Sequence, residues 1–217
     1  MTADHPDDAA RLWRQAQALN RRAAAVSPAA GDLPPLLFFT DGPRTPRPWE
    51  TASRLPAGAA VVFRAFGAED AIKTGRRLRT ATAGRGVRLL VGADADLAQA
   101  LDADGVHLPE RMAGRAADLR RARPDWLITA AIHAISGPLP LDSLDALVAS
   151  PVFATASASA RPVLGLEGLA RATALGRPTY ALGGIDAETA ARLADSGVCG
   201  LAAVGAVQSA FARPIRI

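Results

Sequence analysis

The stretch PTYALGGIDAETAARLADSGVCGLAAVGA, residues 178–206, decides the fold. Two short runs of small and apolar residues, 178–184 and 200–206, flank a segment at 186–196 whose apolar residues recur with helical spacing. Runs that are apolar throughout, without alternation, are typical of strands that are buried on both faces of a parallel sheet. The stretch therefore predicts a strand–helix–strand unit with parallel strands.

The same rhythm begins at residue 36 and repeats along the chain. The other apolar runs are LLFFT (36–40), AAVVFR (59–64), VRLLV (87–91), DGVHL (104–108), WLITAAIH (126–133) and ALVASPVF (146–153), which makes eight in all. Helix patterns stand between them at 68–82, 94–101, 113–122, 166–175 and 186–196. Eight strands that are each followed by a helix predict a (β/α)8 TIM barrel over residues 35–217, with an open doubly wound sheet as the alternative.

Residues 1–34 differ from this pattern. The segment 9–25 predicts an amphipathic helix, because Leu12, Trp13, Ala16 and Leu19 fall on one face. The breaker-rich stretch SPAAGDLPP follows it at 27–35. We therefore expect an N-terminal helical extension that caps the barrel or packs beside it.

Composition excludes several classes of protein. The net charge of +4 comes from 25 basic and 21 acidic residues that are scattered among one another, which argues against nucleic-acid binding. No apolar run approaches the roughly 18 residues of a membrane span, and the N-terminus lacks the order of a secretory signal. A single cysteine, Cys199, excludes an internal disulfide and favours the cytoplasm. Lys73 is the only lysine, so the other 24 basic residues are arginines.

A barrel displays its functional groups at the carboxyl ends of its strands. After the last two strands stand Gly183, Gly184, Gly205 and Ala206. Small residues let backbone N–H groups approach an anion closely, and the start of a helix adds the positive end of its dipole. We predict that these four residues bind phosphate; the alternative is that they only permit tight turns.

Three further features lie at predicted strand ends. The loop SPVFATASASARPVLGLEGL, 150–169, offers Thr155 and Ser157 to the phosphate and Arg161 as a charged partner, unless it is only a solvated loop. His107 and His133 end the fourth and fifth strands, where histidine is suited to proton transfer, although a structural role is the alternative for each. Carboxylates do not cluster at any strand end, so we predict no metal site and no cofactor.

These motifs resemble the thiamine phosphate synthase/thiazole tautomerase superfamily. The matching stretches occur in family order, and they are LLFFTD (36–41), VVFRA (61–65), DADGVHLPE (102–110), ITAAIHA (128–134), SPVFATAS…GLEGL (150–169), ALGGI (181–185) and GVCGLAAVGAV (197–207). The most specific is SPVF-x-T followed by GLEGL. The resemblance covers about residues 36 to 210, and it implies a (β/α)8 barrel.

The resemblance also implies that this chain is a diverged member of the superfamily. The synthases join a thiazole phosphate to a pyrimidine diphosphate, and pyrophosphate leaves with Mg²⁺. In this chain Phe66 stands at the lysine of the family motif Gln-x-Arg-x-Lys, Asp94 at the arginine of Asn-Asp-Arg, Met112 at an aspartate and Ala158 at a loop lysine. These differences remove metal carboxylates and cations that the departure of pyrophosphate requires.

The thiazole-phosphate half of the family site is retained, and His133 stands where the tautomerase branch has its proposed catalytic histidine. The resemblance therefore implies a thiazole-tautomerase-like protein that binds a small phosphorylated heterocycle. His133 is its predicted proton shuttle, and Arg64, His107 and Arg161 are predicted to contact the substrate. The alternatives are a Mg²⁺-dependent thiamine phosphate synthase and a non-catalytic ligand-binding or regulatory homologue. A homo-oligomer is left open.

Overall fold

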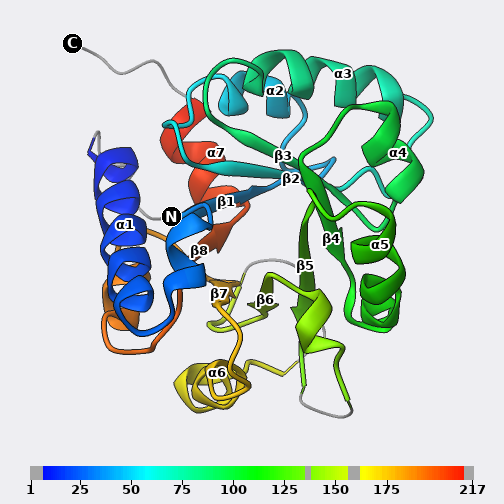
Figure 1. Cartoon of the computed structure of the whole chain (residues 1–217). Coiled ribbons are helices and arrows are strands. Elements are labelled where there is room, and N and C mark those ends of the chain that lie inside the picture. The colour runs from blue at the N-terminus through cyan, green and yellow to red at the C-terminus, as the bar shows by residue number, and fades with distance from the viewer. Residues whose placement is uncertain (1–6, 135–137, 156–161, 213–217) are drawn as a thin grey trace.

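The eight predicted strands form a closed parallel barrel in the order β1 to β8, with β8 paired to β1 (Figure 1). The computed structural model describes residues 7–134, 138–155 and 162–212. The strands are β1 (Leu36–Phe39), β2 (Ala60–Phe63), β3 (Arg88–Gly92), β4 (Gly105–Leu108), β5 (Leu127–Ile132), β6 (Ala146–Ala149), β7 (Thr179–Leu182) and β8 (Gly200–Ala203). The barrel prediction is therefore confirmed, and the open sheet is excluded.

Alternation along the strands gives the protein two apolar cores. Leu37, Phe39 and Val62 belong to the core that fills the barrel interior. Leu36 and Phe38 point the other way and pack beneath the helices. Because both faces of the strands are largely buried, most strand positions are apolar, as the apolar runs indicated.

The helices only partly follow the predicted pattern. They are α2 (Pro48–Ala52), α3 (Ala71–Thr82), α4 (Ala95–Ala100), α5 (Ala116–Ala122), α6 (Gly165–Thr173) and α7 (Gly205–Ala212), with a 3-10 helix η2 (Glu110–Arg115) before α5. The predicted helix at 186–196 is wrong, because that segment forms only the 3-10 turn η4 (Thr189–Leu193). Between β5 and β6 the described residues contain only the 3-10 turn η3 (Leu141–Ser143).

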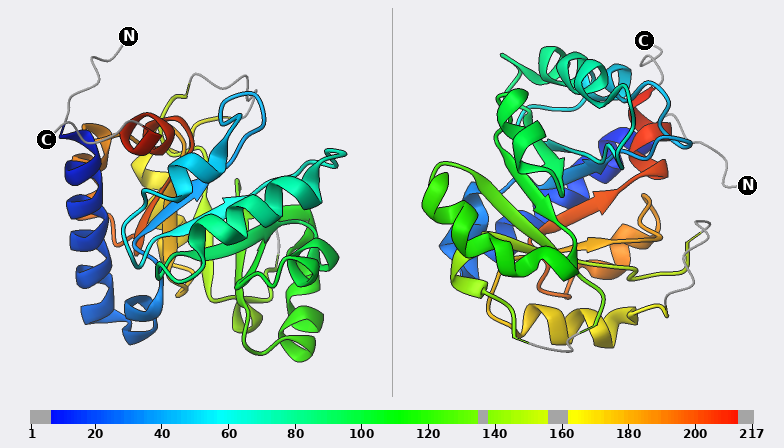
Figure 2. Two further views of the ribbon diagram at one scale, coloured as in Figure 1. Left: turned by 90° about the horizontal axis from the view of Figure 1, so that it is seen from above. Right: turned by 90° about the vertical axis from the view of Figure 1, so that its right-hand side faces the viewer.

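The N-terminal extension explains the short η4. Helix α1 (Asp8–Val26) packs against η4 and β8, and Figure 2 shows it lying along the outside of the barrel. The side chain of Gln15 donates to the carbonyl of Ala187 (3.2 Å), and Arg22 donates to that of Ala194 (2.6 Å). Helix α1 thus covers the face that a full helix after β7 would occupy.

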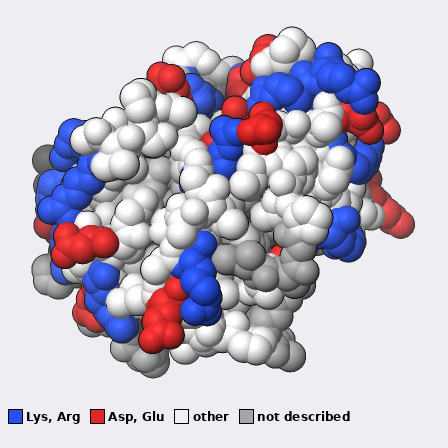
Figure 3. All heavy atoms as spheres, turned by 60° about the horizontal axis from the view of Figure 1, so that its bottom comes forward, with Lys and Arg blue, Asp and Glu red and all other residues white. Residues whose placement is uncertain are grey.

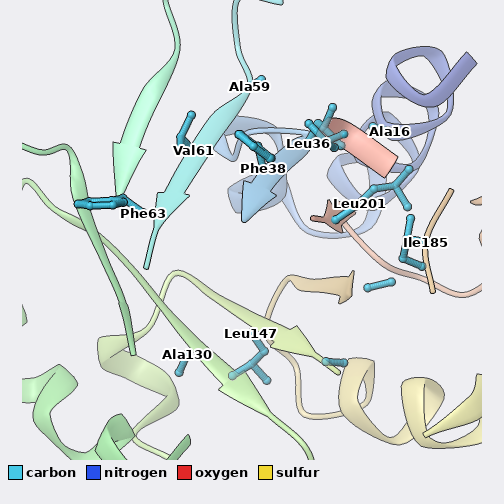
Figure 4. Packing of buried hydrophobic residues seen from close by; sticks show 14 of the residues in the cluster. Ala16, Leu36, Phe38, Ala59, Val61, Phe63, Ala130, Leu147, Ile185 and Leu201 are labelled. Atoms are coloured by element: carbon cyan, nitrogen blue, oxygen red, sulfur yellow. The ribbon is translucent and has the colours of Figure 1, made fainter. Parts of the chain in front are cut away.

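One buried side chain ties the extension to the barrel. Asn20 donates through Nδ2 to the carbonyls of Ala30 (2.7 Å), Leu33 (3.4 Å) and Cys199 (3.2 Å), and so joins α1, the 3-10 helix η1 (Pro28–Asp32) and the start of β8. Figure 4 shows Ala16 of the same helix beside Leu36 and Leu201. The predicted extension therefore packs against the outside of the barrel.

The end of the barrel opposite the strands' carboxyl ends is sealed. The hydroxyl of Tyr180 donates to the carbonyl of Pro34 (2.7 Å). Cys199 is fully buried beside it, and burial raises the pKa of the Cys199 thiol well above its usual value. A buried thiol of this kind is unreactive. Within the described residues, no helix combines the length and apolar character that crossing a membrane demands.

The Asn20 anchor gives a first testable prediction. Replacing Asn20 with Ala removes the side-chain donor that three carbonyls share, although that of Ala30 keeps the N–H of Leu33 (3.3 Å), so we expect the free energy of unfolding to fall by about 2–3 kcal/mol. Urea denaturation followed by circular dichroism measures this change. Arg21→Ala, at the exposed neighbouring position, should change it by less than about 0.5 kcal/mol. Equal effects of the two substitutions would contradict the anchoring role.

Candidate active site

A cavity of about 1710 Å³ opens at the carboxyl ends of the strands. Every strand contributes to its wall, either with its last residues or with the residues that follow it. One contribution from each strand, in order, is Phe39, Arg64, Gly92, His107, His133, Ser150, Gly183 and Gly205. The topology thus brings together residues that are far apart in the sequence, at the end of the barrel where catalytic groups are expected.

His133 lies directly after β5 and lines this cavity. Its Nδ1 is 2.6 Å from the carbonyl oxygen of Ser150, and a carbonyl oxygen can only accept. The proton of the neutral ring is therefore on Nδ1, which leaves Nε2 to accept or deliver a proton. The backbone N–H of His133 donates to Oε2 of Glu110 (3.3 Å), which fixes the peptide that carries the ring.

His107 faces the barrel interior and is 7% exposed at the floor of the cavity. Its Nδ1 is 3.0 Å from Oγ1 of Thr129, and its ring stands edge-on to Phe39 with centroids 4.9 Å apart. Burial first, then the charges of Arg64 and His133, lower the pKa of His107 from 6.5 to about 3. His107 is thus neutral at physiological pH. Its contact with substrate stays a prediction.

Gly183 and Gly184 are required by packing. Both have positive φ, 98° and 66°. A Cβ at Gly183 would stand 2.8 Å from Pro151, and one at Gly184 would stand 2.4 Å from the carbonyl oxygen of Ala154. The loop after β6 lies against them, and Phe153 donates its N–H to the carbonyl of Gly183 (3.0 Å). The tight-turn alternative thus accounts for these two glycines, whether or not they also bind phosphate.

Gly205 and Ala206 are different. Gly205 has an ordinary φ, and a Cβ built on it would meet nothing within 4 Å. It is the first residue of α7 and is exposed at the cavity. Within the described ranges, the N–H groups of Gly205 and Ala206 donate to no protein acceptor. This helix N-terminus therefore offers free donors where the sequence predicted a phosphate.

The loop after β6 is only partly described. Thr155 lines the cavity and is half-buried. Ser157 and Arg161, which were predicted to contact the phosphate and the substrate, lie outside the described residues. Their roles stay predictions.

Arg64 follows β2 and is held from several sides. Its Nε donates to the carbonyl of Thr40 (2.7 Å), and its Nη2 lies 3.4 Å from Oδ2 of Asp41. The guanidinium is also 5.5 Å from the ring centroid of Phe39. The hydrogen bond from Arg44 is the largest cause that lowers the pKa of the Asp41 carboxyl. Because this one carboxylate pairs with two arginines, Asp41, Arg44 and Arg64 together keep a net positive charge.

Sequence reasoning missed five arginines of the cavity, namely Arg11, Arg44, Arg111, Arg115 and Arg192. Arg192 lies over the ring of Phe153, 4.6 Å from its centroid. In the described part of the chain, Arg111, Arg115 and Arg192 form no ion pair with a carboxylate. The feature of the sequence that could have pointed to these arginines is the excess of arginine over lysine. Away from the cavity, Figure 3 shows basic and acidic side chains interspersed on the visible face.

In the part of the chain that the structure describes, the cavity carboxylates do not gather into a group that could hold Mg²⁺. Asp94 accepts from the N–H of Leu97 (2.8 Å) and caps α4. Asp186 accepts from the N–H groups of Glu188 and Thr189 (2.9 and 2.8 Å). Across residues 7–134, 138–155 and 162–212, no group of three or more His, Cys, Asp or Glu side chains could hold a metal ion. Mg²⁺ needs oxygen ligands that converge, and these carboxylates are instead engaged with the backbone.

The family model described as thiamine monophosphate synthase matches residues 49–207 of this chain, well over half of its length. The chain belongs to this family. The thiamine-phosphate synthase of Pyrococcus furiosus is 31% identical over 182 residues, which cover 81% of this chain and 87% of that protein. The thiamine-phosphate synthase of Chloroflexus aurantiacus is 36% identical over 148 residues, 64% of this chain and 66% of that protein.

Other matches are shorter or structural. The thiamine-phosphate synthase of Streptococcus suis is 31% identical over 129 residues, and the match spans only 56% of that protein and 57% of this chain. Among solved structures, a thiamine phosphate pyrophosphorylase from Pyrococcus furiosus matches with a TM-score of 0.68 and 25% identity. That match covers 83% of this chain and 95% of the other. Family and fold therefore agree.

The contrast between the glycines gives a second prediction. We expect Gly184→Ala to lower the free energy of unfolding by about 2 kcal/mol or more. The backbone of Gly184 is in a left-handed conformation, and the added Cβ would overlap the loop after β6. Gly205→Ala should change it by less than about 0.5 kcal/mol. Thermal and urea denaturation measure both. Equal losses would show that Gly205 is also held by packing.

A third prediction concerns His107. The unfolded chain takes up this proton near pH 6.5 but the folded chain only near pH 3, so the stabilising contribution of the neutral ring is lost as the pH falls through this range. The slope is about 1.4 kcal/mol per pH unit at most. The difference in unfolding free energy between wild type and His107→Gln should therefore shrink between pH 6.5 and 4. A His107 ring signal that titrates near pH 6.5 by NMR would contradict this.

Proposed function

We propose that this protein binds a thiazole phosphate at the barrel mouth and transfers a proton on it with His133, as a thiazole tautomerase does. The observation that carries the proposal is the Nδ1 hydrogen bond of His133 to the Ser150 carbonyl. This bond sets the tautomer and leaves Nε2 as the basic atom. Moving a proton from a ring carbon to another atom needs one such acid–base group and no metal.

Phosphate binding is the first step of the proposal. The N–H groups of Gly205 and Ala206 lie at the start of α7, where the dipole of the helix favours an anion. Gly183 and Gly184 shape the adjacent turn, and Thr155 lines the same cavity. A phosphate held there would anchor the ligand, so its ring would extend over the mouth toward His133.

The second step is proton transfer. Nε2 of His133 takes the proton from the ring carbon, and the imidazolium that forms keeps its Nδ1 hydrogen bond to Ser150. The same nitrogen then returns the proton to the acceptor atom, so the histidine ends in its starting state. Arg64, pinned by Asp41 and Thr40, would face the part of the ligand that carries negative charge.

The second candidate function is thiamine phosphate synthesis. The names of the relatives favour it, because each is called a thiamine-phosphate synthase or pyrophosphorylase. Arg44, Arg111, Arg115 and Arg192 could supply some of the positive charge that a diphosphate needs. The absence of converging carboxylates among the described residues argues against the Mg²⁺ step.

The cytoplasmic location stays a prediction.

The fourth prediction separates the two functions. Incubation with the thiazole carboxylate tautomer should accelerate its aromatisation, followed by absorbance, and His133→Gln should slow the reaction about 100-fold or more. The affinity for thiazole phosphate should change less than twofold, because the phosphate contacts are unaltered. Equal rates for His133→Gln, wild type and buffer would refute the tautomerase function and leave a binding role.

The matched assay supplies thiazole phosphate, pyrimidine diphosphate and Mg²⁺, and it measures pyrophosphate. We expect none above the blank. Pyrophosphate release that depends on Mg²⁺ would establish the synthase function instead.

A further inference from the structure

Phe66 combines two features that packing does not explain. It lies three residues after β2, lines the cavity and is 75% exposed. Its φ is +49°, in the left-handed region that a bulky side chain rarely adopts. An exposed aromatic ring buries little surface that could offset this conformation. Strained residues of this kind gather at functional sites.

The fold does not need Phe66 to position its neighbour. The ring of Phe66 is 5.1 Å from the Arg64 guanidinium. Arg64 is already held by the Thr40 carbonyl, by Asp41 and by the ring of Phe39. Arg64 therefore keeps its place through contacts on its other sides, and the ring of Phe66 is available to a ligand.

We propose that Phe66 determines substrate specificity by offering its exposed ring as a stacking surface for the planar heteroaromatic ring of the ligand. The inference rests on the proposed function, because it concerns the ring of the same phosphorylated ligand. Aromatic rings attract one another in offset or edge-to-face arrangements. The Arg64 guanidinium lies over the Phe66 ring, 5.1 Å from its centroid, so it adds a cation to the stack, which suits an electron-rich ring.

The placement of Phe66 suits a ligand that is anchored at α7. Strand β1 alone separates β2 from β8, so the residues that follow these two strands stand on the same side of the mouth, and Phe66 and Gly205 line the same cavity. Phe66 also stands at the family's motif lysine, so a neutral ring replaces a cation at this point.

Isothermal titration calorimetry with two ligands tests the inference. Hydroxyethylthiazole phosphate carries the ring, and glycerol phosphate carries the same anion without one. Wild type should bind the thiazole phosphate about tenfold more tightly. Phe66→Leu, which keeps apolar bulk, and Phe66→Asn, which suits the left-handed backbone, should reduce this preference to less than twofold and leave glycerol phosphate binding unchanged.

Two controls accompany these variants. Phe66→Tyr keeps the aromatic face and should retain the preference. Val26→Ala, at an exposed apolar position on α1 that does not line the cavity, should behave as wild type. If Phe66→Leu and Phe66→Asn still bind thiazole phosphate more tightly than glycerol phosphate, the inference is overturned. Phosphate binding at the site would not be affected by that result. If wild type binds neither ligand, the proposed function fails as well.

Discussion

The hydrogen-bonded pairing of β8 with β1 is the constraint on which the site depends. It closes the sheet, and closure of eight parallel strands brings all their carboxyl ends to one mouth. His133 and Gly205 are 72 positions apart in the chain, yet they line one cavity. At the opposite end, Tyr180 bonds the Pro34 carbonyl and Asn20 ties the N-terminal extension to Cys199.

The charged groups at the mouth bear on the choice between the two candidate functions. Among the described residues, the N–H groups at the start of α7 have no protein acceptor, and we propose that they hold the phosphate. Nearby carboxylates such as Asp94 and Asp186 are engaged in capping backbone N–H groups, so they do not converge on a cation. In the proposed function, His133 supplies the acid–base chemistry, for which one such group suffices. Monophosphate binding joined to proton transfer is the function that we propose for these residues.

Sequence alone predicted the strands well and the site only in part. Mostly apolar runs located all eight strands, because burial on both faces strongly favours apolar residues. The helix expected at 186–196 failed because α1, a distant segment, covers that face. The buried state of His107 and the packing origin of Gly183 also depend on tertiary neighbours. The motifs placed His133 at the cavity but could not show its bond to Ser150.

A crystal structure of the protein with hydroxyethylthiazole phosphate tests the central claim most directly. The account predicts that the phosphate accepts hydrogen bonds from the N–H groups of Gly205 and Ala206, and that the ring lies within reach of Nε2 of His133. Phosphate density at Arg111 and Arg115 instead, with the ring away from His133, would contradict it.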